Sequence, residues 1–218
     1  MPRYDSCMIA LYGIHRLMKD HRLTLGFYHH PLTINTAQCF SRWLLLATLV
    51  ILAGCATAPK KQPPLPMAAQ ARILELRQQA LPERLPVPVK GIKYQQLRDT
   101  WGSARSQGRR HEGIDIMADR GTKVLSATPG VVVDLRNNNL GGKVVWIAGP
   151  AGSYHYYAHL NKHKRGLKVG DRVRKGQVIG YVGNTGNARG GSPHLHYGIY
   201  LAGKGRGAVN PYFYLMRP

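Results

Sequence analysis

Cysteine is nearly absent from this chain, and the little there is lies toward the N-terminus. The three cysteines are Cys7, Cys39 and Cys55, and no cysteine follows Cys55. The sequence after Cys55 therefore has no thiol to oxidise to a disulfide and no thiolate to hold zinc. Any metal bound in that part of the chain must be held by nitrogen and oxygen ligands.

A hydrophobic run long enough to cross a bilayer is also missing. The apolar run Trp43–Ala53 falls short of the roughly 20 residues that a spanning helix needs. Its length fits the apolar core of a secretory signal, which has about 7–15 residues. The run ends in Leu52-Ala53-Gly54-Cys55, which resembles the lipobox of bacterial lipoproteins. In that family the cysteine receives a diacylglyceryl group and becomes the new N-terminus.

We therefore predict a leader and lipoprotein signal over residues 1–54 and a lipid anchor at Cys55. The resemblance implies an exported protein of the cell envelope, and Ala56 suits the outer membrane, facing the periplasm, if the cell has two membranes. The alternative is a buried core helix followed by a chance cysteine. Residues 1–40 make the leader unusually long, and a start site assigned too early would explain them.

Acidic residues are few, with 10 Asp and Glu against 31 Lys and Arg and a formal net charge of +21. Such a balance attracts anionic polymers. Export argues against nucleic acid, so we expect no nucleic-acid partner. The carboxylates of cell-wall peptides and the headgroups of a membrane both fit the compartment, and charge alone does not choose between them.

Helical patterns are scarce after the signal. Residues 55–90 form a predicted linker rich in Pro, Ala and Lys, with one short amphipathic helix over residues 70–81 that either docks on the domain or lies on the membrane. Residues 91–218 form the predicted globular domain, a mainly β antiparallel sheet or sandwich with glycine at its turns. Its expected strands are Ile114–Met117, Thr122–Ser126, Gly130–Leu135, Lys143–Ile147, Ser153–His159, Val178–Val182 and His196–Leu201.

The residues with the clearest chemistry are two histidines in one apolar, strand-like run. His194 and His196 are two positions apart, and side chains at i and i+2 of a strand share one face. Imidazole is both a common metal ligand and a common proton-transfer group. Such a pair can hold a metal with one ring and move a proton with the other.

Three further residues could complete this site. His111 and Asp115 lie in HEGID, and His159 lies in YYAHL. His111, Asp115 and His196 could supply the three protein ligands of a hydrolytic Zn²⁺, with His159 and His194 left for proton transfer. In the simpler alternative His111 is an exposed polar residue and Asp115 a partner for the surplus arginines.

These motifs occur in the same order in lysostaphin-like, LytM-type zinc peptidoglycan endopeptidases, which the chain resembles from about Gly91 to Pro211. The stretches HEGIDIMADRGTKVLSATPGVVV, YYAHLNK, LKVGDRVRKGQVIGYVGNTG and PHLHYGIY carry the resemblance. It implies a barrel-sandwich-like antiparallel fold with a groove lined by loops. It also implies His111, Asp115 and His196 as zinc ligands, His159 and His194 as catalytic residues, and hydrolysis of peptide bonds in peptidoglycan.

The chain departs from the family at one visible place. Relatives often have Glu two residues after the H-x-H pair, and this chain has Gly198. That Glu is not a ligand, so zinc binding is not threatened. Arg109, Arg110 and Arg189 flank the motifs and are candidates for binding substrate carboxylates, or are solvated loop charges. Tyr157 lines the groove or packs in the core.

Three other functions compete with the hydrolase. A zinc-free regulator of the same fold would bind and activate other wall hydrolases, but its signature is loss of the five site residues, and all five are present. A biotinyl-type or lipoyl-type carrier would need a modifiable lysine at a hairpin tip, and Lys175 lacks the expected neighbours. A purely structural wall-binding lipoprotein would need no zinc set. We expect a monomer that acts on peptidoglycan, with the cleaved bond and any protein activator left open.

Overall fold

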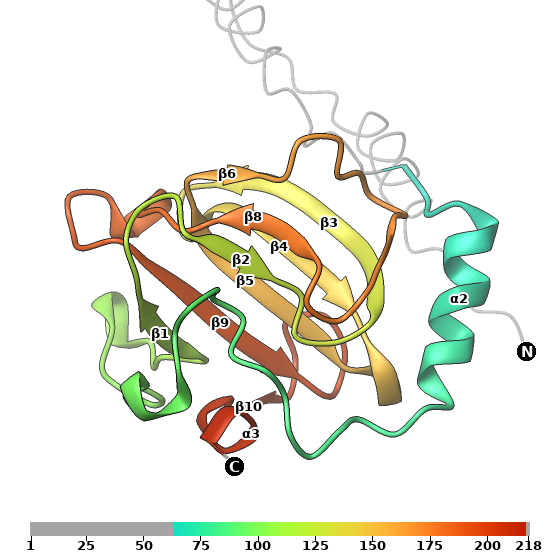
Figure 1. The fold of residues 1–218 in the computed structure, drawn as a ribbon, viewed down its shortest axis with the longest axis horizontal. Helices are drawn as coiled ribbons and strands as arrows, with labels where there is room; N and C mark the ends of the chain where they lie inside the picture. The colour runs from blue at the N-terminus through green and yellow to red at the C-terminus, as the bar shows by residue number, and fades with distance from the viewer. Residues whose placement is uncertain (1–62, 217–218) are drawn as a thin grey trace, which may run out of the picture. The chain divides into compact units, whose positions relative to one another are not determined.

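The computed structural model describes residues 63–216, and the description below concerns these residues (Figure 1). The two α-helices are α2 (Met67–Arg77) and α3 (Tyr212–Met216). The strands are β1 (Ile114–Met117), β2 (Lys123–Leu125), β3 (Gly130–Asn138), β4 (Gly142–Ala148), β5 (Tyr154–Leu160), β6 (Lys162–His163), β7 (Arg172–Val173), β8 (Val178–Tyr181), β9 (His194–Tyr200) and β10 (Ala208–Val209). Short 3-10 helices are η2 (Tyr94–Gln96), η3 (Ser106–Gly108), η4 (Pro150–Gly152) and η5 (Gly186–Ala188).

The strands form two antiparallel sheets, which confirms the predicted fold class. The larger sheet has the order β1-β9-β5-β4-β3-β7, and β10 pairs with the C-terminal end of β9, beyond the residues that pair with β1. The smaller sheet has the order β2-β8-β6. Each of the seven expected runs overlaps one strand of the structure. The strands β6, β7 and β10 were not expected, because two residues are too few to show alternation.

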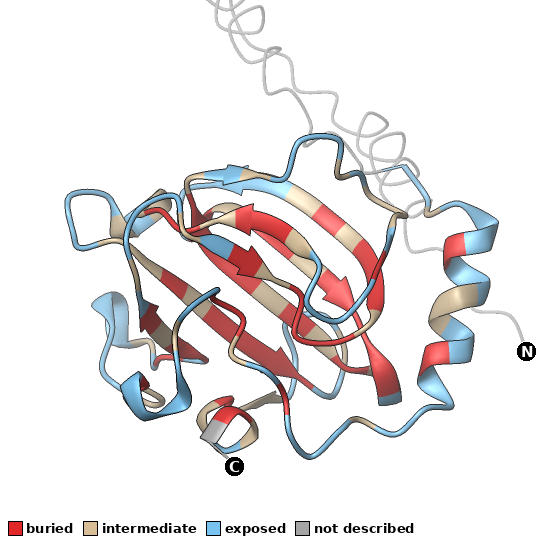
Figure 2. Cartoon of the chain, viewed as in Figure 1, coloured by how far each residue is buried: buried red, intermediate tan, exposed pale blue. Residues whose placement is uncertain are grey.

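The core lies between the two sheets (Figures 1 and 2). The smaller sheet covers one face of the larger one, where Leu195, Tyr197 and Ile199 of β9 are fully buried. These residues belong to one apolar cluster with Val124 of β2 and Ile179 of β8. The alternate residues of β9 point to the opposite face of the larger sheet, and that face carries the site described below.

The segment before the sheets packs onto the domain. Helix α2 begins and ends earlier than the expected residues 70–81, and its Ala69 and Leu76 are buried against Val131 of β3. Farther along, Leu85 and Val89 belong to the main core cluster. Of the two alternatives for this helix, the structure has it docked on the domain. These four buried side chains hold this segment against the sheets.

The predicted signal and the anchor at Cys55 lie outside the described residues. Between residues 63 and 216, neither helix has the length and apolar character needed to span a bilayer. The predicted domain boundary at residue 91 stays a prediction.

Candidate metal centre

Two neighbouring strands bring the first ligand pair together. In the antiparallel register of β1 and β9, Asp115 lies directly opposite His196. Directly opposite residues of such a pair project to the same face. Ile114 and Ile116, on either side of Asp115, are buried in the core. The alternation of β1 therefore presents the carboxylate on the open face of the sheet, beside the imidazole.

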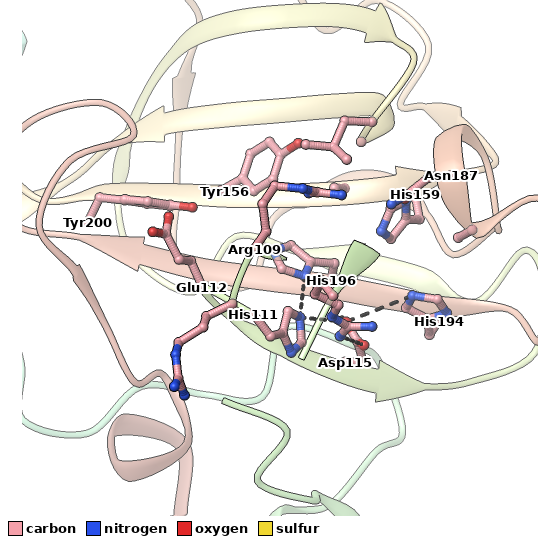
Figure 3. A pocket seen from close by; sticks show the side chains of 16 residues that line it. Arg109, His111, Glu112, Asp115, Tyr156, His159, Asn187, His194, His196 and Tyr200 are labelled. Carbon is pink, nitrogen blue, oxygen red and sulfur yellow. Dashed lines mark hydrogen bonds and ion pairs between the residues drawn. The ribbon is translucent and has the colours of Figure 1, made fainter. Parts of the chain in front are cut away.

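His111 completes a group of three converging ligand atoms (Figure 3). Its Nε2 lies 2.7 Å from Nδ1 of His196 and 3.1 Å from Oδ1 of Asp115, and His196 Nδ1 lies 3.3 Å from the same oxygen. Ligand atoms around a tetrahedral zinc, at bond lengths of about 2.0–2.1 Å, lie roughly 3.3 Å apart. The donor set of two nitrogens and one carboxylate oxygen thus fits one divalent cation.

Hydrogen bonds outside this group fix the His111 ring. The Nδ1–H of His111 donates to the backbone carbonyl of Thr100 at 2.7 Å, which leaves the lone pair on Nε2 facing the other two ligand atoms. The hydroxyl of Thr100 also accepts the backbone N–H of Asp115 at 3.0 Å. Thr100 therefore orients both residues from outside the metal position.

Asp115 stays ionised in this environment. Burial acts to raise the pKa of Asp115, but its close contacts with His111, His196 and Arg105 outweigh burial and hold that pKa well below its usual range. Burial also lowers the pKa of His196, so its imidazole stays neutral at neutral pH. A negative carboxylate and neutral imidazoles are the forms that bind a metal.

His159 reaches the site through an irregularity in β5. Its place in the alternation puts it on the core side with His155 and Tyr157, which are fully buried. One extra residue lies in β5 between Tyr157 and Leu160, where the register with β4 shifts, and the φ of His159 is +61°. A β-bulge re-aims side chains, and a positive φ is rare outside glycine. Together they turn the His159 ring toward the open face.

Two imidazoles flank the three candidate ligands without joining them. The rings of His159 and His194 have centroids 5.0 Å apart, and His194 Nε2 lies 3.8 Å from Asp115 Oδ1. His159 Nδ1–H donates to the carbonyl of Thr185, and His194 Nδ1–H donates to that of Ser192, both at 2.9 Å. The neutral form of each ring then has Nε2 as its remaining acceptor.

All five predicted metal and catalytic residues line one cleft of about 440 Å³. Its lining residues are Arg105, Arg109, Arg110, His111, Glu112, Asp115, Leu140, Gly141, Tyr156, Ala158, His159, Asn187, Ala188, His194, His196 and Tyr200. The side chains of His111, Asp115, His159, His194 and His196 lie close together in Figure 3. The size of the cleft is in the range of small-ligand and peptide-side-chain sites.

Of the three predicted substrate-binding residues, one lines the cleft and two do not. Arg110 lines the cleft, whereas Arg189 is exposed and lies outside the lining residues. The prediction that Tyr157 binds substrate is corrected, because this side chain is fully buried in the core. Its hydroxyl accepts the backbone N–H of Ala127. The cleft residue is its neighbour Tyr156, whose ring lies edge-on to His196 with centroids 5.6 Å apart.

Four residues near the candidate ligands were not predicted from the sequence. Tyr156 could have been found by alternation, because it lies opposite Gly198 on the face that carries His196. Gly113 leaves room for the His196 ring, since an added Cβ would lie 2.7 Å from its Cε1. Thr100 and Arg105 act from an irregular segment, and no periodic pattern points to them.

Comparisons with known proteins agree with this geometry. The family model of peptidase family M23 matches residues 109–211. An L-Ala–D-Glu endopeptidase of Bacillus subtilis is 44% identical over 126 residues, covering 54% of this chain and 39% of that protein. The peptidoglycan DD-endopeptidase ShyC of Vibrio cholerae is 38% identical over 97 residues, covering 44% of this chain and 22% of that protein.

A solved structure is similar as well. A protein from Ruminococcus gnavus, described as a candidate glycyl-glycine endopeptidase of the LytM type, is 35% identical with a TM-score of 0.50. The match covers 61% of this chain and 58% of that one. The chain spans well under half the length of the two endopeptidases above. The similarity therefore concerns the domain that holds the cleft.

Proposed function

Because this chain carries a domain of peptidase family M23, we propose that the protein is a zinc-dependent endopeptidase that hydrolyses peptide bonds in peptidoglycan. The observation that carries the proposal is the convergence of His111 Nε2, Asp115 Oδ1 and His196 Nδ1 beside two further imidazoles. Three ligands leave one coordination position open, as in catalytic zinc sites.

In this proposal His111, Asp115 and His196 hold Zn²⁺. Zinc held by three protein side chains lowers the pKa of a coordinated water to about 7 and polarises a carbonyl oxygen. The open face of the sheet lets a peptide chain approach, and the cleft walls confine it. Asp115 supplies the single negative charge among the ligands, so the loaded site keeps a net positive charge toward the substrate carbonyl.

His159 and His194 are assigned to proton transfer and to charge stabilisation around the scissile bond. Each has its Nδ1–H committed to a backbone carbonyl, so each presents Nε2 to the cleft. Burial lowers the pKa of His159 to about 4, which keeps it neutral and able to accept a proton at neutral pH. The proton taken from the attacking water is then available for the leaving amine.

The substrate assignment follows the chemistry of the relatives. One relative cuts the L-Ala–D-Glu bond and another is a DD-endopeptidase, so the fold serves different bonds of the same polymer. The basic side chains of Arg109 and Arg110 in the cleft suit the carboxylates of stem peptides. Digestion of purified muropeptides with and without zinc, with products read by mass, identifies the bond. Hydrolysis that survives a chelator would contradict the zinc mechanism.

The rival function is a zinc-free regulator that binds and activates other wall hydrolases. It is the weaker proposal because the ligand atoms of His111, Asp115 and His196 all lie within 4.8 Å of one another. Zinc stoichiometry of the purified chain separates the two, since a hydrolase should hold one ion and a regulator none.

We further propose that the chain is an envelope lipoprotein anchored at Cys55, facing the periplasm where two membranes exist. The lipobox-like sequence Leu52–Cys55 and the excess of basic residues support this location. Replacing Cys55 with Ala should abolish labelling by a fatty-acid probe and move the chain out of the membrane fraction. Unchanged labelling of Cys55→Ala would contradict the anchor.

A further inference from the structure

Arg105 stands apart from the other arginines of the cleft, because it alone forms an ion pair with one of the three candidate ligands. Its Nη2 lies 2.5 Å from Oδ2 of Asp115. Arg109, four residues later, donates instead to the hydroxyl of Ser106 at 3.1 Å. Within residues 63–216, no ion pair joins Arg109 or Arg110 to a carboxylate.

The two oxygens of Asp115 have different partners. Oδ2 takes the Arg105 guanidinium, while Oδ1 lies 3.1 Å from His111 Nε2 and 3.3 Å from His196 Nδ1. A free carboxylate can coordinate a cation through one oxygen or through both. With Oδ2 held by Arg105, only Oδ1 is directed at the point where the imidazole nitrogens converge.

The backbone around Arg105 is fixed, which makes this pairing more than a chance surface contact. The chain before His111 folds back on itself: the His111 N–H donates to the Ser103 carbonyl at 3.0 Å, and Gly102 donates to the His111 carbonyl at 2.9 Å. The Arg105 N–H donates to the Arg109 carbonyl at 2.9 Å. The Asp115 side chain is only 16% exposed, so the ion pair is partly shielded from water.

We infer that Arg105 is a positioning residue that holds Asp115 as a one-oxygen ligand and so raises the affinity of the site for zinc. This inference rests on the metal site of the proposed function. Arg105 would then have two opposing effects on the zinc affinity of the site. A positive charge beside a cation site should weaken cation binding by repulsion. If positioning dominates, removing that charge must weaken zinc binding instead of strengthening it.

The test is zinc affinity of the full chain, measured by competition with a chromophoric chelator. Arg105→Ala should bind zinc about 10- to 100-fold more weakly than the unaltered chain, the usual cost of losing a partner of a metal ligand. Arg105→Lys keeps a donor and a charge and should recover part of the loss. Arg109→Ala removes the same charge from the same segment without touching Asp115, so its zinc affinity should stay within about twofold.

Cobalt substitution adds a signature that a general loss of stability would not produce. A carboxylate that binds through both oxygens raises the coordination number, and visible absorption of Co²⁺ weakens as coordination rises above four. The Arg105→Ala chain, saturated with Co²⁺, should therefore absorb less strongly than the unaltered chain. Circular dichroism of the metal-free proteins checks that the variants fold.

The outcomes are distinguishable from those of the proposed function. Zinc binding by Arg105→Ala that is as tight as, or tighter than, that of the unaltered chain would overturn the inference while leaving the endopeptidase proposal intact. An unaltered chain that binds zinc but cuts no muropeptide would overturn the endopeptidase proposal alone. An unaltered chain that binds no zinc would overturn both.

Discussion

The ring of His159 meets the ring of His194 edge-on, with centroids 5.0 Å apart and an interplanar angle of 64°. The two rings come from different strands, β5 and β9, and each donates its Nδ1–H to a backbone carbonyl. Backbone hydrogen bonds therefore orient both rings. In the proposed mechanism, proton transfer and metal binding are thus assigned to separate side chains.

This separation predicts that the two functions can be lost independently. His159→Ala and His194→Ala should each keep one zinc per chain, because neither ring is among the three converging ligand atoms. Each should lower the rate of muropeptide hydrolysis by about 10²- to 10⁴-fold, the usual contribution of a general acid or base. Zinc content by elemental analysis and initial rates at saturating zinc check this. A variant with normal rate would remove that histidine from the mechanism.

Replacing a ligand should give the opposite pattern. His111→Ala and Asp115→Ala each remove one of three ligands, so zinc content should fall well below one per chain and hydrolysis should disappear with it. Excess zinc should recover activity only in part, since the site geometry is incomplete. Full zinc content in Asp115→Ala would show that the carboxylate is not a ligand.

Much of this site could be predicted because regular strands carry it. The positions of His194 and His196 follow from the alternation of β9, whose intervening Leu195 and Tyr197 are buried. The expected strands likewise follow from short apolar runs separated by glycine. Where one face of a strand is buried, alternation fixes which side chains share the other face.

The parts that could not be predicted depend on departures from regular structure. Strict alternation places Tyr157 and His159 on one face, yet the bulge and the positive φ of His159 separate them. That is why His159 lines the cleft although Tyr157, two residues earlier, lies in the core. Thr100 and Arg105 act through contacts set by an irregular segment, and sequence spacing carries no signal for such contacts.

The close approach of Gly113 to His196 yields a third prediction. A Cβ at residue 113 would lie 2.6 Å from the Tyr197 carbonyl oxygen and 2.7 Å from His196 Cε1. Gly113→Ala should therefore displace the His196 ring and weaken zinc binding by at least about tenfold. Gly191→Ala is a matched control, because its added Cβ has its nearest neighbour at 3.3 Å, the carbonyl of Ala188. Equal zinc affinities in the two variants would contradict a role for Gly113 in seating the ring.

His155 gives a prediction about acid stability that does not involve the metal. It is fully buried, with Nδ1 2.8 Å from the Tyr197 hydroxyl and Nε2 3.1 Å from the Ser153 hydroxyl, and burial lowers its pKa to about 3. The unfolded chain, with a histidine pKa near 6.5, takes up a proton that the folded chain excludes. Stability should therefore fall as pH drops below about 6.5, by about 2 kcal/mol from this residue between pH 7 and pH 5.

The measurement is urea unfolding of the full chain with chelator present, so that release of metal does not contribute to the pH dependence. His155→Gln should be less stable at pH 7, because it disturbs a buried hydrogen-bonded pair, but should lose about 2 kcal/mol less on going to pH 5. His163→Gln, at a half-buried ring bonded to the Val144 carbonyl, should flatten the dependence by a smaller amount. An acid slope that is the same with and without His155 would mean that this ring is protonated within the fold, and the buried pair with Tyr197 would have to open to admit the charge.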